Sequence, residues 1–235
     1  MGTLYLVPTP IGNLADITLR SLRTLFDVDV IACEDTRRTG LLLEKLLVKF
    51  SPNPEDKRKP RLLSYYDQVE LQRIPEIITL LKNEQNIALV SDAGMPAISD
   101  PGFKLVRECI KEGLRVESLP GASSVLTALT VSGLPTDKFL FVGYPPHKPG
   151  HRLDFFKDIK TSLETVNSTL IFFEAPHKLQ TSLKDLQNVF GDIDIVLARE
   201  LTKMYEEIRR EKISESLLHF KKTAPKGEFV LLFHL

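Results

Sequence analysis

Short apolar runs alternate with amphipathic stretches through the first half of the chain, and this alternation is the strongest constraint on its fold. The stretches between the runs carry apolar residues at helical spacing, and Asp16 is expected to cap the first helix. Alternating strands and helices favour a mostly parallel sheet covered by helices on both faces. Residues 1–118 are therefore predicted to form an N-terminal, doubly wound α/β domain. Its strands are expected at residues 3–7, 28–32, 62–64, 87–90 and 114–119.

The pattern changes after residue 118. A helix rich in small residues is expected at 122–132, and the hinge-like sequence Gly133-Leu134-Pro135-Thr136 follows it. Helices separate only some of the later strands, so this sheet is expected to be mixed. Residues 119–235 are thus predicted to form a C-terminal α/β domain. Its strands are expected at 139–142, 169–173, 193–198, 204–212 and 229–233, and its further helices near 153–158 and 179–190.

Composition and charge limit the classes of function. The 235 residues have a formal net charge of zero and a pI of about 7.0, so a nucleic-acid partner has to bind at a local basic patch. Basic groups of this kind lie at residues 57–61, 148–152 and 209–212, the first of them in a proline-broken segment, 51–61, expected to be an exposed loop.

The sequence gives no sign of a metal site, a membrane span or secretion. Cys33 and Cys109 have neither metal-ligand nor disulfide spacing, which suits a reducing compartment. The first residues lack a leader-like pattern, and no apolar run is long enough to cross a bilayer. We therefore expect a cytoplasmic protein that needs no metal.

Unusual loops follow three of the predicted strands. They cover Pro8–Asn13, Ser91–Gly102 and Pro120–Ser124, and they are rich in glycine, proline and small polar residues. In open α/β sheets, ligands bind beyond the carboxyl ends of the strands, and glycine lets the backbone approach a ligand closely. Neither GxGxxG nor GxxxxGK[ST] occurs, so dinucleotide and P-loop sites lack support. The alternative interpretation is that each loop is only a tight turn.

Several segments together resemble a known family. In order, they are LYLVPTPIGNLADITLRSL, CEDTRRTGLLL, ALVSDAGMPAISDPG, LPGASSVLTAL, SGLPTDKFLFVG, LIFFEAPHKL, ARELTKMYEE and KGEFVLL. They are similar to segments of the ribosomal RNA small-subunit methyltransferase I family, within the tetrapyrrole methylase superfamily. The resemblance implies a two-domain methyltransferase, usually a homodimer, that binds S-adenosylmethionine in a cleft between its domains. The implied reaction is 2′-O-methylation of a cytidine in small-subunit ribosomal RNA.

The same resemblance implies which residues line the cofactor site. They are Pro10, Ile11, Gly12, Ala93, Gly94, Met95, Ile98, Ser123, Ser124, Glu174 and Leu201. Two features depart from the family. The family usually has a His-Glu-His-Asn run where this chain has Tyr66-Asp67-Gln68-Val69, and its members commonly continue past the strand matching 229–233, whereas this sequence ends at Leu235.

The residues expected to perform the chemistry lie after the second predicted strand. Methyl transfer to a hydroxyl needs in-line placement and removal of a proton from the attacking oxygen. Glu34, Asp35 and Arg37 belong to the densest charged cluster at any predicted strand end, so we expect them to face the substrate. The alternative is that Asp35 caps the next helix while the arginines are solvated.

Two other functions stay open at this point. A methylase of small tetrapyrrole-type molecules would also use arginines, against the many carboxylates of its substrate, although the EDTRRTG and EAPH segments favour the RNA family. A catalytically silent module that only binds the cofactor is the other alternative. Intact cofactor binding without methyl transfer would identify such a module.

Overall fold

The computed structural model describes residues 1–50 and 60–235, which divide into two compact units, Met1–Ser123 and Ser124–Leu235. The sequence placed the domain boundary after residue 118, whereas the units divide after Ser123. Most of the segment predicted as an exposed loop, residues 51–59, lies outside the described residues. Among the helices that are described, none is both long and apolar enough to cross a membrane.

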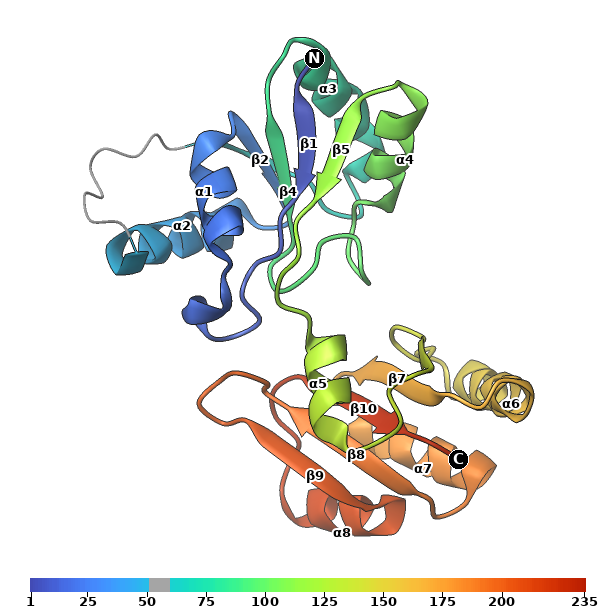
Figure 1. The fold of residues 1–235 in the computed structure, drawn as a ribbon. Coiled ribbons are helices and arrows are strands. Elements are labelled where there is room, and N and C mark those ends of the chain that lie inside the picture. The colour runs from blue at the N-terminus through green and yellow to red at the C-terminus, as the bar shows by residue number, and fades with distance from the viewer. Residues whose placement is uncertain (51–59) are drawn as a thin grey trace. The chain divides into compact units, whose positions relative to one another are not determined.

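A five-stranded sheet forms the centre of the first unit, in the order β3-β2-β4-β1-β5 (Figure 1). All of its strand pairs are parallel. The predicted parallel architecture of this half is therefore confirmed. The strands are β1 (Thr3–Leu6), β2 (Val30–Cys33), β3 (Arg61–Ser64), β4 (Ile87–Val90) and β5 (Arg115–Ser118).

Helices cover both faces of this sheet (Figure 1). They are α1 (Leu19–Asp27), α2 (Thr36–Phe50), α3 (Glu70–Lys82) and α4 (Phe103–Lys111). Helices α1 and α2 pack on one face, against strand residues that include Ile31 and Val90. Helices α3 and α4 pack on the other face, where Ala32 and Leu89 point. Because neighbouring strand residues point to opposite faces, strands covered on both faces are apolar at every position, as β2 and β4 are.

The start of α1 differs from the prediction. Asp16 does not cap this helix, because it lies in a separate 3-10 turn, η1 (Leu14–Asp16). Thr18 is the N-cap instead, and its Oγ1 accepts a hydrogen bond from the backbone N–H of Ser21 at 3.0 Å. Thr18 has the extended backbone that an N-cap requires and a side-chain oxygen that reaches the third helical residue. The cap predicted at Asp16 is therefore wrong.

The second unit contains the predicted mixed sheet, in the order β6-β7-β10-β8-β9. Strands β6 and β7 are parallel, and the other pairs are antiparallel. The strands are β6 (Phe139–Phe141), β7 (Thr169–Glu174), β8 (Asp194–Arg199), β9 (Glu207–Lys212) and β10 (Phe229–Phe233).

The helices of the second unit are α5 (Ser124–Ser132), α6 (Pro149–Thr165), α7 (Leu179–Phe190) and α8 (Ile213–Lys222). Helices α6, α7 and α8 share a core with alternate residues of the sheet, among them Phe172, Leu197 and Leu231. Helix α5 packs against β7, β8 and β10. The sequence did not predict α8, which is rich in charged and polar residues, and it predicted α6 as much shorter.

A buried carboxylate holds the loop between β4 and α4 in place. Glu70, in the first turn of α3, is 3% exposed. It accepts hydrogen bonds from the Tyr65 hydroxyl at 2.8 Å and the Gly102 N–H at 3.1 Å, and Lys104 Nζ lies 2.8 Å from its other oxygen. Burial by itself raises the pKa of Glu70, but hydrogen bonds from Lys104, Tyr65 and Gly102 outweigh it and leave the pKa lowered. The end of the loop is thus tied to α3.

This network predicts a stability difference between two glutamates of α3. Glu70→Ala leaves the Tyr65 hydroxyl and the Gly102 N–H without their buried acceptor, so we expect a loss of about 3 kcal/mol. Glu76 forms solvent-exposed ion pairs with Arg61 and Arg73, and Glu76→Ala should cost less than about 1 kcal/mol. Urea denaturation of both variants measures the difference. Equal losses would contradict the anchoring role of Glu70.

Candidate functional site

The three loops singled out in the sequence leave the same edge of the first unit. Because β1, β4 and β5 are parallel and adjacent, their carboxyl ends lie side by side. Val7 continues β1 with a hydrogen bond to Leu89, and Leu119 continues β5 with one to Leu6. The loops therefore start at neighbouring points, where open α/β sheets bind their ligands.

Backbone hydrogen bonds join the loop after β1 to the loop after β4. Thr9 and Gly94 form an isolated antiparallel bridge, with N···O distances of 3.0 and 3.1 Å. The Thr9 hydroxyl also donates to the carbonyl oxygen of Ser91 at 3.1 Å. Thr9 and Ser91 are both buried, so these bonds are shielded from water. They fix the shape of both loops.

Two glycines sit where the loops come closest. Gly94 has a φ of +85°, and a Cβ there would lie 3.2 Å from Ile11 Cγ2 and 3.6 Å from the carbonyl oxygen of Ala122. A Cβ on Gly121 would lie 2.5 Å from Cβ of Pro8. Gly94 thus contacts segments from all three loops, and only glycine combines this φ with this spacing.

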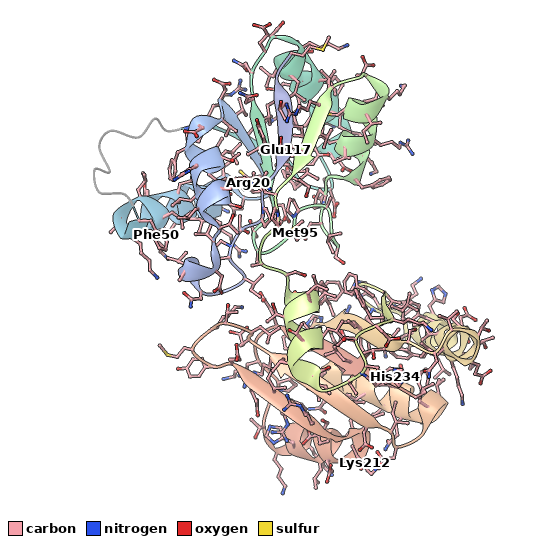
Figure 2. The ribbon with its side chains drawn as sticks, viewed as in Figure 1. Arg20, Phe50, Met95, Glu117, Lys212 and His234 are labelled. Atoms are coloured by element: carbon pink, nitrogen blue, oxygen red, sulfur yellow. The ribbon has the colours of Figure 1, made fainter. Side chains whose placement is uncertain are left out.

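The loop after β4 keeps an unusual backbone and exposes apolar side chains. Ala97 and Ser99 have φ values of +66° and +61°, which non-glycine residues seldom adopt and which cluster at functional sites. Ile98 is 49% exposed, and Met95 is half-buried at the edge where the loops leave the sheet (Figure 2). An apolar, backbone-rich surface of this kind suits a flat ligand with polar edges.

The structure distributes the predicted cofactor residues over both units. It gathers one set at the loop edge of the first unit: Pro10, Ile11, Gly12, Ala93, Gly94, Met95, Ile98 and Ser123. Ser124, Glu174 and Leu201 belong to the second unit. Glu174 and Leu201 are buried, and Glu174 accepts a hydrogen bond from the N–H of Ala175 at 2.8 Å. Burial raises the pKa of Glu174.

Asp35 caps a helix, as the alternative interpretation proposed. Helix α2 begins at Thr36, and Asp35 Oδ1 accepts hydrogen bonds from the N–H groups of Arg37 at 2.8 Å and Arg38 at 3.4 Å. The Arg37 side chain, which is 90% exposed, reaches back to Asp35 Oδ2 at 2.9 Å. Hydrogen bonds from the Arg37 side chain and backbone lower the pKa of Asp35 to about 2, which makes it a weak proton acceptor.

Glu34 stands in a different environment from Asp35. It is half-buried, and its Oε1 accepts a hydrogen bond from the Asp92 N–H at 3.3 Å. Burial raises the pKa of Glu34, and the nearby charges of Asp92 and Asp67 raise it further. Glu34 therefore holds a proton more readily than Asp35 does.

Asp100 and the ion pair between Arg38 and Asp92 also belong to this edge. Burial and the charge of Glu34 raise the pKa of Asp100 to about 6. Arg38 Nη1 lies 2.7 Å from Asp92 Oδ2 and joins α2 to the loop after β4. The sequence did not predict the link from Arg38 to Asp92, because the two residues are distant in sequence. Within residues 1–50 and 60–235, no group of three or more His, Cys, Asp or Glu side chains is arranged to hold a metal.

The basic groups found in the sequence are largely engaged inside the protein. Arg61 pairs with Glu76, and the buried Arg152 pairs with Asp185 at 2.7 Å. The Arg209 guanidinium pairs with Glu207 and Glu211. The Arg210 guanidinium donates to the carbonyl oxygens of Val131 and Ser132 at the end of α5. Residues 57–59 lie outside the described residues. These groups offer few free cations for phosphate contacts.

Comparisons with known proteins agree with this architecture. The model of the tetrapyrrole (corrin/porphyrin) methylases matches residues 3–216. The Thermus thermophilus uroporphyrin-III C-methyltransferase, solved in complex with S-adenosylhomocysteine, shares the fold with a TM-score of 0.63 and 17% identity, over 98% of this chain and 97% of its own.

Two curated relatives are much more similar in sequence. The ribosomal RNA small subunit methyltransferase I of Thermotoga maritima is 45% identical over 99% of this chain and 98% of its own length. The protein of the same name from Escherichia coli O157:H7 is 46% identical over 98% of this chain and 77% of its own length. The chain therefore belongs to the ribosomal RNA small-subunit methyltransferase I family, within the tetrapyrrole methylases.

Proposed function

We propose that this protein methylates the 2′-hydroxyl of a cytidine in small-subunit ribosomal RNA, with S-adenosylmethionine as the methyl donor. The observation that carries the proposal is the 45% identity to the Thermotoga maritima relative over almost the full length of both chains. The loop edge of the first unit supports it, because glycines at the closest approaches let the three loops pack together where open α/β sheets bind their ligands. When bound, S-adenosylmethionine supplies an electrophilic methyl group.

The residues of the loop edge fit the cofactor. Apolar side chains of Ile11, Met95 and Ile98 offer contacts to a flat base, and the backbone around Gly94 offers polar groups for its edges. We propose that these residues bind the cofactor together with Pro10, Gly12, Ala93 and Ser123. Ser124, Glu174 and Leu201 of the second unit stay predicted cofactor residues, although Glu174 and Leu201 are buried within that unit.

The charged cluster after β2 is proposed to act on the substrate. Glu34 is suited to accept the proton of the attacking hydroxyl, because its pKa is raised toward neutrality. The Arg37 guanidinium is paired with Asp35 but is 90% exposed, so it can also contact a phosphate of the RNA. Asp35 fixes the first turn of α2, and so it sets the position from which Arg37 extends.

We also propose a homodimer. One side of α5 is buried in its own unit through Val125, Ala128 and Leu129, while Leu126 and Val131 stay 50% and 40% exposed. A helix that is apolar on both sides is expected to be covered by a further element. A two-fold contact with a second copy provides such a cover.

Transfer of labelled methyl groups tests the proposed reaction. The protein is incubated with labelled S-adenosylmethionine and with small ribosomal subunits, or their naked RNA, from cells that lack this modification. In a parallel reaction a tetrapyrrole replaces the RNA. We expect one labelled position, a cytidine whose 3′-phosphodiester bond resists alkaline hydrolysis because its 2′-oxygen is methylated. Label in a tetrapyrrole but not in RNA would support the small-molecule alternative, and cofactor binding without transfer would support the silent module.

A glycine comparison tests the proposed cofactor loop. Gly94→Val should lower the affinity for S-adenosylhomocysteine at least 10-fold, because its side chain crowds Ile11 and the backbone of Ala122. Gly113→Val is the matched control. It has a similar φ of +67°, and so a similar backbone strain, but nothing lies within 4 Å of its Cβ position. Calorimetry should show nearly unchanged affinity in the control. Equal affinity in both variants would remove residues 93–98 from the cofactor site.

Isosteric amide variants test the separate roles proposed for Glu34 and Asp35. These residues follow the carboxyl end of β2, which we call the catalytic edge. Glu34→Gln should lower methyl transfer roughly 100-fold, which is the usual scale for a positioned acid–base group. Cofactor affinity should stay within a few-fold of the wild type. Asp35→Asn should keep most of the activity, because asparagine also caps helices well. Single-turnover rates and calorimetry on both variants provide the comparison. A larger loss of rate in Asp35→Asn than in Glu34→Gln would reverse the assignment.

A further inference from the structure

The cations of the first unit fall into two groups. Most of those in its described residues form an ion pair with a carboxylate. They are Arg37, Arg38, Arg61, Arg73, Lys82, Lys104, Lys111 and Arg115. Within the same described residues, no carboxylate lies at ion-pair distance from Arg20, Arg23, Lys45, Lys49 or Arg107. Lys49 and Arg107 instead lie over the rings of Phe50 and Phe103, at 5.5 and 5.9 Å from the ring centroids.

Four of these five cations lie on α1 and α2. Arg20 and Arg23 are three residues apart on α1, and Lys45 and Lys49 are four residues apart on α2, so each pair shares one side of its helix. All of them are exposed, and their helices cover the same face of the sheet. Figure 2 labels Arg20 on α1 and Phe50 at the end of α2 on this side of the unit. We call these four residues the α1–α2 cationic face.

This face is continuous with the proposed catalytic edge. Helix α2 starts beside Asp35 at the carboxyl edge of the sheet, and Arg37 projects from its first turn. From Arg37 to Lys49 the helix extends about 18 Å. Leu41 and Val48, between them, are 51% and 80% exposed, so the outer side of α2 is not packed against its own unit. A ligand at the catalytic edge can therefore follow α2.

Charge decides which partner this face fits. A polyanion gains from each uncompensated cation, because neutralised phosphates release their counterions. A second copy of this chain, related by a two-fold axis through the face, would bring the same cations against one another. We propose that the α1–α2 cationic face holds the phosphate backbone of the RNA substrate beside the catalytic edge. The identification of this polyanion as ribosomal RNA rests on the proposed function.

Two variants with equal charge changes test the proposal. The first replaces Arg20, Arg23, Lys45 and Lys49 with alanine. The second replaces Arg73, Lys82, Lys111 and Arg115 with alanine, which removes the same residue types from α3, α4 and the start of β5, away from α1 and α2. Binding of unmodified small-subunit ribosomal RNA is measured over a series of salt concentrations, and S-adenosylhomocysteine binding is measured in parallel.

The first variant should bind RNA about 10-fold to 100-fold more weakly. Its slope of log affinity against log salt should also become shallower by roughly 3, because each lost phosphate contact removes about 0.7–0.9 from the slope. The second variant should stay within about 3-fold of the wild type, and cofactor affinity should be unchanged in both. Equal RNA affinity in the two variants would overturn the proposal. So would a change of mass in light scattering without a change in RNA affinity, because the face would then join two copies of the chain.

Failure of the proposed function gives a different result. If the wild type binds the RNA but transfers no methyl group to it, the proposed reaction is wrong, and the comparison of the two variants still decides whether the face binds RNA. If the wild type binds no RNA, both proposals are overturned.

Discussion

The parallel pairing of β1 with its neighbours β4 and β5 is the constraint on which the proposed site depends. Parallel strands end at one edge, so loops that are far apart in sequence emerge side by side. The bridge between Thr9 and Gly94 then locks two of these loops together, and the close approach at Gly94 brings in the third. Glu70 belongs to α3, and it fixes the end of the loop after β4 by accepting a hydrogen bond from Gly102. The edge is thus built before any ligand binds, which lowers the entropic cost of binding.

Neighbouring carboxylates at this edge differ in burial and in hydrogen bonding, so their pKa values shift in opposite directions. Asp35 accepts hydrogen bonds from the Arg37 side chain and from two backbone N–H groups, and these bonds hold its pKa low. Glu34, one residue earlier, loses water contact and meets other negative charges, so its pKa rises. Asp100 shares this environment, and its pKa of about 6 lies close to neutral pH. Pairs of acids whose environments separate their pKa values are typical of catalytic sites.

The sequence predicts those parts of this fold that depend on local patterns. Strand β4 and helix α7 have the predicted limits, because apolar spacing and flanking Asn and Gly residues define them locally. The cap at Asp16 was wrong because Thr18, which can also cap a helix, lies two residues later and directly before α1. Helix α8 was missed because its buried side includes Ser216, which weakens the apolar periodicity. The bonds from Glu70 to Gly102 and from Arg38 to Asp92 join residues distant in sequence, so no local pattern indicates them. The loops were predicted, but the contacts that shape them were not.

The loops at the carboxyl edge of the first sheet are proposed to bind the methyl donor. Hydrogen–deuterium exchange with and without S-adenosylhomocysteine tests this most directly, because it reports backbone protection along the whole chain. We expect slower exchange in residues 8–13, 91–102 and 120–123 on binding, and unchanged exchange in α1 and the second half of α2. Bound ligand that leaves these three loops unprotected would contradict it.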